Sequence, residues 1–285
     1  MAIFSLSISN ISRGRGESTL ARLGYITGQA ISDNYLGKTH YGNHYGKAPE
    51  VVETLLPPGA PPAWSNPEVL FNDIEIFERN RNARTGVQIL IALPREWNLQ
   101  TSIQALREYV QEQLCSLGYA ATFTIHEGEN NNPHAHILIP NRPVDSKTGD
   151  WVKVKTRQHY ALDENGERIP IIDPETGKQK LGKRNERLWK RRTVESNPLD
   201  QKDVLKDLRK TWADTANRHL DETDWIDHRS LKEQGKDRIP QIHLGRAAKQ
   251  LQASGQPSDR VAIADRIDQA NKNITKLKAE LADLE

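Results

Sequence analysis

The chain has 285 residues, of which 36% are hydrophobic and 27% are charged, a composition typical of a globular protein with its own core. Lys and Arg total 40 against 38 for Asp and Glu, so the formal net charge of +2 excludes a globally basic nucleic-acid binder. Cys115 is the single cysteine, which excludes an internal disulfide and a thiolate metal cluster. The N-terminus has no signal-peptide layout and no 18 apolar residues run together, so we expect a cytoplasmic protein without a membrane-inserted segment.

The N-terminal part predicts a strand, a basic loop and a short helix. Residues 2–9 alternate between apolar and β-forming residues, which indicates a strand entering the core. The loop 12–18 (SRGRGES) contains two arginines and two glycines. Its last residue, Ser18, is suited to cap the following helix, which carries Tyr25.

The middle of the chain alternates between helical and strand spacing. Residues 33–49 have no sustained period and are expected to be irregular surface, and the prolines of 56–67 end the first part. Apolar spacing then predicts helices at 67–84, 99–117 and about 204–220, and strands at 87–94, 121–126 and 134–140.

Two further segments have their own patterns. The turn signals SKTGD, DENGE and DPETGK within residues 145–182 predict hairpins that project from the core. Residues 260–285 predict a helix with near-heptad apolar spacing. This helix ends without a cap, so we expect that the chain is cut from a longer one.

The segment 126–139 (HEGENNNPHAHILI) is the most informative for chemistry. Residues two apart on a strand point to the same side, so His134 and His136 project together. His126 ends the preceding strand, and a hairpin can bring it beside the other two. Three imidazoles on one face can bind a divalent cation and leave positions open for a substrate oxygen, although ordinary hairpin histidines would show the same pattern.

The expected cofactor is a divalent metal, Mg²⁺ or Mn²⁺, with Zn²⁺ as the alternative. Imidazole favours Zn²⁺ by affinity, whereas phosphate chemistry favours Mg²⁺ or Mn²⁺ through metal availability. The sequence does not choose among them.

Local basic segments predict contacts with nucleic acid. Arg13 and Arg15 in the first loop can hold phosphates, or can simply be solvated. Residues 147–192 hold 13 Lys or Arg against 7 Asp or Glu, with aromatic residues between them. Cations beside aromatics suit a groove for single-stranded nucleic acid, and a charged, solvated arm is the alternative. The residues predicted to contact DNA in this segment are Trp151, Lys153, Lys155 and Arg157.

The order of these motifs resembles a known family. An N-terminal strand, an Arg/Gly/Ser loop and a Tyr in the first helix precede His…Asn-Pro-His-Ala-His, and residues 226–245 (IDHRSLKEQGKDRIPQIHLG) follow. This order is similar to that of the MobA/MobL relaxases of mobilisable plasmids, which belong to the HUH endonucleases. The resemblance covers residues 1–245, and the motifs are specific only in combination.

The resemblance implies an α+β fold: a central, palm-type antiparallel sheet flanked by helices, with the protruding hairpins and a C-terminal helix. Residues 1–245 would be the nicking and joining domain, and 246–285 a linker and helical tail. It implies that Tyr25 is the nucleophile and that His126, His134 and His136 are the metal ligands.

One position departs from the family pattern. Relatives commonly carry Glu on the strand before Ala-Leu-Pro, whereas this chain has Gln88 on the equivalent strand. An amide can orient a histidine N–H but cannot act as a base. What deprotonates Tyr25 is therefore open, and the carboxylates that could substitute are Glu75, Glu78, Glu127 and Glu129.

The C-terminal signature has no assigned chemical role. Asp227, His228 and Arg229 are expected to form a buried polar network that fixes this part of the chain. His243 can be either structural or in contact with DNA.

The function implied is a metal-dependent relaxase that nicks and rejoins one strand at a plasmid origin of transfer through a 5′-phosphotyrosyl intermediate. Its expected partners are single-stranded or supercoiled plasmid DNA, accessory mobilisation proteins and the type IV secretion coupling machinery. Three alternatives stay open: a rolling-circle replication initiator, a non-catalytic metal-stabilised DNA-binding or autoregulatory module, and a generic metallohydrolase.

Overall fold

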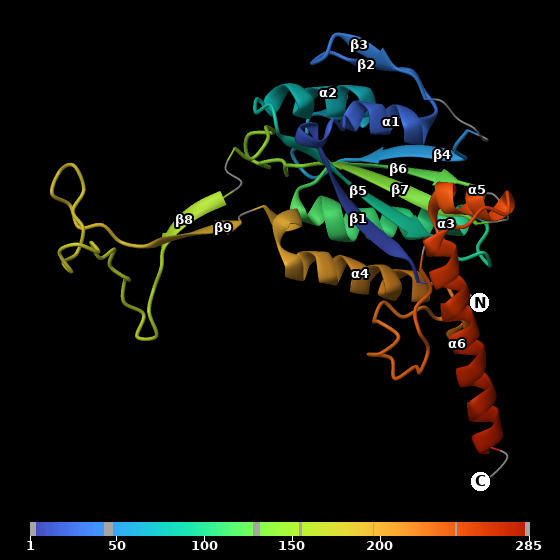
Figure 1. Ribbon diagram of the computed structural model, residues 1–285. Coiled ribbons are helices and arrows are strands. Elements are labelled where there is room, and N and C mark those ends of the chain that lie inside the picture. Colours follow the sequence, from blue (N-terminus) through green and yellow to red (C-terminus); the bar gives the residue numbers. More distant parts are fainter. Residues whose placement is uncertain are drawn as a thin grey trace. The chain divides into compact units, whose positions relative to one another are not determined.

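The computed structural model describes residues 4–42, 48–127, 132–153, 156–195, 197–242 and 244–282 (Figure 1). The chain divides into two compact units, Met1–Ile226 and Asp227–Glu285. The predicted end of the nicking domain at residue 245 is a functional boundary, whereas the division at residue 226 reflects only contacts within the chain. The functional boundary therefore stays a prediction.

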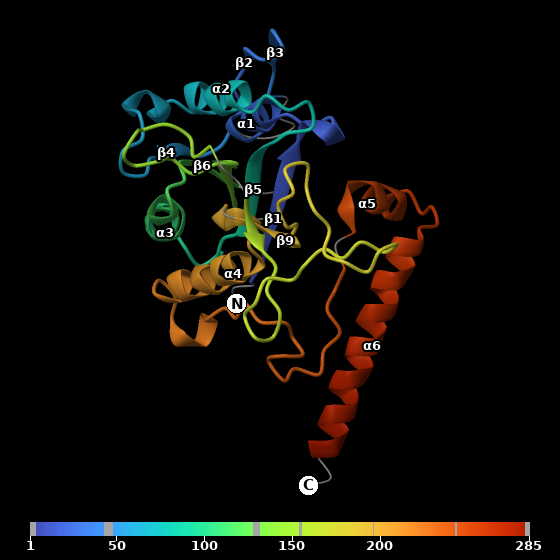
Figure 2. The ribbon, with the colours of Figure 1, turned by 90° about the vertical axis from the view of Figure 1, so that its left-hand side faces the viewer.

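The first unit is built on a five-stranded antiparallel sheet with the strand order β1-β5-β7-β6-β4. Helices α1 and α2 cover one face of this sheet, and α3 and α4 cover the other (Figures 1 and 2). The predicted α+β class with a central antiparallel sheet is therefore confirmed. The sheet strands are β1 (Leu6–Ser12), β4 (Val51–Leu55), β5 (Arg84–Ala92), β6 (Ala121–His126) and β7 (His134–Pro140).

Local sequence signals start the helices that cover the sheet. The side chains of Ser18, Asn66 and Asn98 accept hydrogen bonds from backbone N–H groups in the first turns of α1, α2 and α3. The helices of this unit are α1 (Thr19–Thr27), α2 (Pro67–Phe77), α3 (Leu99–Tyr109) and α4 (Lys202–Asn217).

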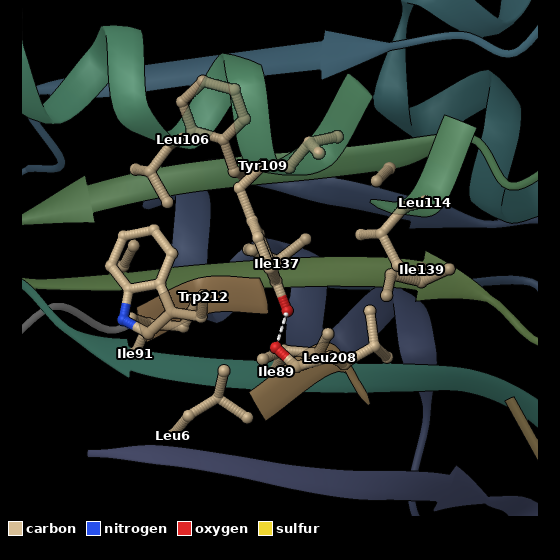
Figure 3. Close-up of a cluster of buried hydrophobic side chains, with 14 of the residues drawn as sticks. Leu6, Ile89, Ile91, Leu106, Tyr109, Leu114, Ile137, Ile139, Leu208 and Trp212 are labelled. Carbon is tan, nitrogen blue, oxygen red and sulfur yellow. Dashed lines mark hydrogen bonds between the residues drawn. The ribbon is translucent and has the colours of Figure 1, made fainter. Parts of the chain in front are cut away.

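The two faces of the sheet pack into separate cores. On the α3 and α4 side, Ile89, Ile137 and Trp212 are fully buried, and Tyr109 Oη donates to the carbonyl of Leu208 at 2.8 Å (Figure 3). On the α1 and α2 side, a second cluster includes Leu20, Leu23, Ile26, Phe71, Trp64 and Trp151.

Several predicted boundaries differ from the structure. The helix predicted at 67–84 ends at Phe77, and Arg84 already belongs to β5, which was predicted to begin at Val87. Residues 33–49, expected to be irregular, include a short hairpin of β2 (Ile31–Asp33) and β3 (Lys38–His40). The edge strand β4 was not predicted, and the first strand begins later than residue 2. Strands β2, β3 and β4 have only three to five residues each, and their residues differ in exposure. Their sequences therefore lack the apolar alternation of a longer strand.

The predicted projecting hairpins form an arm that pairs with itself. Strands β8 (Thr156–Tyr160) and β9 (Arg191–Glu195) make a two-stranded sheet separate from the central one. Isolated bridges such as Leu162–Arg168 and Ile172–Gln179 close the turns between them.

The second unit contains α5 (Gly245–Ala253) and α6 (Asp259–Ala282). The segment before α5 lies along α6, because the side-chain amide of Asn271 pairs with both backbone groups of Ile239 at 2.8 and 3.0 Å. The predicted C-terminal helix is thus present.

Candidate active site

Helix α1, which carries Tyr25, is fixed to the sheet at its N-terminal end. The hydroxyls of Thr19 and Thr85 lie 2.5 Å apart, and the backbone N–H of Thr19 donates to Glu75 Oε1 at 3.3 Å. A Cβ at Gly86 would lie 2.9 Å from the methyl carbon of Thr19. Glycine at this position therefore allows the helix to approach β5 closely.

The C-terminal half of α1 is positioned by glycine contacts. A Cβ at Gly42 would come within 3.0 Å of backbone atoms of Gly24 and Gly28, so the chain leaving the β2–β3 hairpin packs directly on this end of the helix. Tyr25 lies next to Gly24 and keeps 51% of its surface exposed. The helix is rigidly held while its tyrosine stays accessible.

The three predicted histidines come together at one end of β6 and β7. The strand register pairs His126 with His134 and Thr124 with His136, which places the three imidazoles on the α1 side of the sheet. The ring centroids of His126 and His136 are 5.1 Å apart, those of His134 and His136 are 5.2 Å apart, and those of His126 and His134 are 5.6 Å apart.

Tyr25 faces this cluster from the helix. Its ring centroid lies 6.3 Å from that of His136, with the two planes nearly perpendicular at 89°. The guanidinium carbon of Arg22 lies 6.0 Å from the Tyr25 ring centroid. Arg22 was not predicted from the sequence as a site residue. Its spacing three residues before Tyr25 gives the two residues a common helix face, but only tertiary packing shows that this face meets the histidines.

The environment of His136 keeps its imidazole neutral. The side chain is buried, and its Nδ1 lies 2.5 Å from the Gln88 side-chain nitrogen. Burial, followed by the electrostatic influence of His134, His126 and Arg22, lowers the pKa of His136 to about 3. Near pH 7 the ring therefore keeps a lone pair that a metal ion can accept.

The Gln88 amide can present either of two groups to His136. With its nitrogen toward Nδ1, the amide donates a hydrogen bond and places the ring proton on Nε2. With the amide turned over, its oxygen accepts from Nδ1–H and leaves the Nε2 lone pair for a metal. Gln88 thus lies where its amide can select the tautomer of His136.

The other two rings have different partners. His134 Nδ1 lies 3.0 Å from the carbonyl of Asn132 and donates to it, which leaves Nε2 unprotonated. His126 Nε2 donates to the carbonyl of Ile26 at 2.9 Å, which ties β6 to the helix residue next to Tyr25. In this tautomer the lone pair of His126 is on Nδ1.

The three imidazoles are donors that a divalent metal accepts, and their rings lie close together, but their present orientations do not form a metal site. A ligating ring nitrogen lies about 2 Å from the ion, which places three ring centroids about 5 Å from one another. Within the described ranges, no three His, Cys, Asp or Glu side chains already stand in an arrangement that could hold an ion. Metal binding here would require the ring of His126 to turn from Ile26 toward the other two.

Two of the carboxylates proposed as bases are engaged elsewhere. Glu75 pairs with Arg13 through contacts of 2.5 and 2.9 Å, and Glu78 pairs with Arg142 at 2.7 Å. Both carboxylates are buried, so their charge is needed to compensate these arginines. Glu127 directly follows His126 at the end of β6 and is the described candidate nearest to the cluster in sequence.

The two loop arginines are not equivalent. Arg13 donates to Glu75 and to backbone carbonyls of α2, and its guanidinium carbon lies 3.8 Å from the Tyr35 ring centroid. This side chain holds the loop to the protein instead of presenting free donors to a phosphate. Arg15 pairs with Glu17 at 2.7 Å, but its side chain is 56% exposed, so its predicted DNA contact stays a prediction.

One predicted DNA contact is wrong. Trp151 is 2% exposed and stacks on Trp64 inside the core, with ring centroids 4.1 Å apart. Its ring is used in packing, so it cannot stack on a DNA base. Lys153 is exposed, and its predicted contact stays open. Lys155, Glu129 and His243 lie outside the described residues, as does the side chain of Arg157.

The predicted buried network of the C-terminal signature is also wrong. Asp227 and Arg229 form an ion pair at 2.7 Å, with 31% and 55% of their side-chain surfaces exposed. The hydrogen bond from Arg229 lowers the pKa of Asp227 to about 2. His228 lies 3.9 Å from Asp227 and is 30% exposed, so this is a local turn motif and not a buried network.

Comparison with known proteins shows the family to which the chain belongs. The model of the MobA/MobL family matches residues 17–254. The chain belongs to the MobA/MobL family. It is 49% identical over 284 residues to a probable mobilization protein MobA of Bifidobacterium longum, covering 99% of this chain and 50% of that protein. It is 28% identical to mobilization protein A of Escherichia coli, covering 98% of this chain and 34% of that protein.

The chain thus spans half or less of the length of these MobA/MobL relatives. A solved structure described as the molecular basis of vancomycin resistance transfer in Staphylococcus aureus matches with a TM-score of 0.58 and 21% identity, covering 80% of this chain and 100% of that one. This likeness supports the fold. Among the described residues, no helix is long and apolar enough to span a membrane.

Proposed function

We propose that this chain is a relaxase that cuts and rejoins one DNA strand at a plasmid origin of transfer, using Tyr25 as the nucleophile. The observation that carries the proposal is the exposed Tyr25 ring, 6.3 Å from His136 at the edge of a three-histidine cluster. The names of the relatives, which are mobilization and conjugal transfer proteins, support plasmid DNA as the substrate.

The proposed step exchanges one phosphodiester for another. The Tyr25 oxygen attacks phosphorus in line with the leaving 3′-oxygen, so that a tyrosyl O–P bond forms as the bond from phosphorus to the 3′-oxygen breaks. The phenol proton is lost and the 3′-oxygen gains one, which yields a 5′-phosphotyrosyl protein and a free 3′-hydroxyl. The bond energy is conserved, so a 3′-hydroxyl can reverse the step without ATP.

His126, His134 and His136 would hold a divalent metal, Mg²⁺ or Mn²⁺, with Zn²⁺ as the alternative. When bound, such an ion supplies positive charge that stabilises the phosphate oxygens. Gln88 would orient His136 by accepting its Nδ1–H. The low pKa of His136 keeps this residue unprotonated at the pH of the reaction.

Arg22 would act from the helix side of the site. Its guanidinium carries a permanent charge and lies 6.0 Å from the Tyr25 ring, on the same face of α1. A guanidinium there can pair with an oxygen of the phosphate that Tyr25 attacks and so stabilise its negative charge.

The test uses supercoiled plasmid DNA that carries the cognate origin, with Mg²⁺ or Mn²⁺. Denaturing electrophoresis should show a covalent protein–DNA adduct with the native chain and none with Tyr25→Phe, which removes only the hydroxyl. The matched control is Tyr41→Phe, at a more exposed tyrosine, and it should leave adduct formation unchanged.

Three outcomes would replace the proposal. DNA binding without nicking would indicate a non-catalytic DNA-binding or autoregulatory module. A released 5′-phosphate would indicate a metallohydrolase. Adduct formation only at a replication origin would indicate a rolling-circle initiator.

The proposed partners follow from the same function. We expect accessory mobilisation proteins at the origin and coupling to a type IV secretion system. The proposed DNA contacts outside the site are Arg15, Lys153, Lys155 and Arg157. Replacing these basic residues by alanine should weaken DNA binding and make the affinity less dependent on salt.

A further inference from the structure

A cavity lies at the start of the helix that carries Tyr25 and is separate from the histidine cluster. It has a volume of about 590 Å³, is open to solvent on one side, and is lined by the loop 13–18, the start of α1, the β2–β3 hairpin and the end of α2 with the residues after it. This volume is in the range of about 300–1,000 Å³ that holds small organic ligands. The proposed chemistry at Tyr25 does not use this cavity.

The wall of the cavity is preformed. His40 Nε2 lies 2.9 Å from Asp33 Oδ2 and 3.4 Å from the Ser18 hydroxyl, which fastens the hairpin to the start of α1. Glu75 is paired with Arg13 at the base of the cavity. The carboxylates that line the cavity therefore already have partners: Glu75 pairs with Arg13, Glu17 pairs with Arg15, and Asp33 is hydrogen-bonded to His40.

Two cations and one aromatic ring are left for a ligand. Within the part of the chain that the structure describes, Lys38 and Arg81 line the cavity, and their exposed side chains have no ion-pair or hydrogen-bond partner. Tyr35 also lines the cavity and is 43% exposed, with Arg13 stacked over one face of its ring. An aromatic ring and two unpaired cations in the wall of one cavity suit a nucleotide, because the base can stack and the phosphates can pair.

The cavity lies along the face of α1 that leads to Tyr25. Ala21 lines the cavity and precedes Tyr25 by four residues, so the two residues share a helix face about 6 Å apart along the axis. This distance is comparable to the spacing of successive phosphates in an extended single strand. A strand that reaches Tyr25 can therefore enter the cavity within one or two nucleotides.

We propose that this cavity is a nucleotide subsite that binds one unpaired nucleotide of the DNA strand, one or two positions from the scissile phosphate. The base stacks on Tyr35, and the adjacent phosphates pair with Lys38 and Arg81. The inference rests on the proposed function for its location relative to the scissile bond, but binding of single-stranded DNA by these residues can be measured independently of nicking.

Binding is tested with the full chain and a fluorescent twelve-nucleotide single strand of deoxythymidine, by anisotropy over a range of salt concentrations. Tyr35→Ala should weaken binding about 5- to 150-fold, the loss expected when one stacked base is lost. Tyr35→Trp should restore binding, because it keeps an aromatic face.

The phosphate contacts have their own readout. Lys38→Ala combined with Arg81→Ala should lower the slope of log K against log salt by about 1.4, or about 0.7 for each contact. The matched control is Arg79→Ala, at an exposed arginine two residues away that does not line the cavity, and its slope should match that of the native chain. Equal effects of Arg79 and Arg81 would overturn the subsite.

Photo-crosslinking locates the base. A single strand that carries one 5-iododeoxyuridine should crosslink to Tyr35, and the crosslink should persist in Tyr25→Phe. Native affinity in Tyr35→Ala together with no crosslink at Tyr35 would overturn the subsite even if nicking occurs. A crosslink without any covalent adduct at Tyr25 would support the subsite and contradict the proposed function instead.

Discussion

The two faces of the central sheet are formed by the same strands but have different contents. Ile89, Ile137 and Ile139 face α3 and α4, where they pack with Trp212 in an apolar core (Figure 3). One residue away on the same strands, Gln88 and His136 face the α1 side. The alternation of strand side chains thus places a stabilising core and a polar cluster back to back.

This arrangement separates stability from chemistry. The histidine cluster at one end of the α1 side gains little stability from burial, and burial keeps His136 uncharged, whereas the rest of that side packs in the core that includes Leu138. The apolar face supplies the packing that keeps the strands in register. Neighbouring residues of β7 should therefore respond to substitution in different measurements.

The largest expected effect is from His136→Gln, which removes one imidazole from the cluster and keeps a polar side chain. Nicking should fall by about 1,000-fold, because charge stabilisation of the transition state is lost. The melting temperature should change little. The measurement is the rate of adduct formation beside a thermal melt, and unchanged nicking would remove His136 from the mechanism.

Ile137→Ala is the matched substitution on the other face. It should lower the free energy of unfolding by about 2–5 kcal/mol, because the side chain is fully buried. Denaturant titration measures this, and the folded fraction should nick at the native rate. A selective loss of nicking would show that the two faces are coupled.

Gln88→Leu tests how the polar face orients a ligand. Metal affinity should fall by about 10- to 100-fold, because the partner of His136 Nδ1 is lost. Gln88→Glu should at least restore the affinity, since a carboxylate also accepts from Nδ1–H. Isothermal titration with Mn²⁺ gives both values, and equal affinities for all three chains would exclude the proposed role.

Gly42→Ala tests how α1 is positioned above the polar face. The new methyl group would meet the backbone of Gly24 and Gly28 and should cost about 1–3 kcal/mol of stability. Gly37→Ala is the control for losing a glycine of the same hairpin, since a Cβ there meets no atom within 4 Å, although its φ of +63° adds some strain. If Gly42→Ala is no more destabilising than Gly37→Ala, the close contact does not position α1.

Much of the fold followed from short-range patterns. The strands at His126 and His134, the helix of Tyr25 and its cap at Ser18 each depend on nearby residues, and these elements were predicted close to their observed places. The β2–β3 hairpin and β4 were not predicted, because short strands owe their pairing to partners distant in sequence.

Exposure was harder to predict than secondary structure. Trp151 lies in a basic segment with interspersed aromatic residues, which is why it was predicted to contact DNA. In the structure its ring stacks on Trp64, which comes from a distant part of the chain. Arg13 was predicted to hold a phosphate, but in the structure its guanidinium pairs with Glu75. Arg22 has no motif of its own and gains its position only when α1 packs on the sheet.

The sequence by itself determined the periodicities, and with them the strand positions that place three imidazoles on one side and the helix that carries Tyr25. The tertiary structure decided which charged and aromatic side chains stay accessible, and it brought Tyr25 and Arg22 to the histidines. The physical reason is that periodicity depends on local backbone geometry, whereas burial, pairing and pKa depend on side chains that lie far apart along the chain.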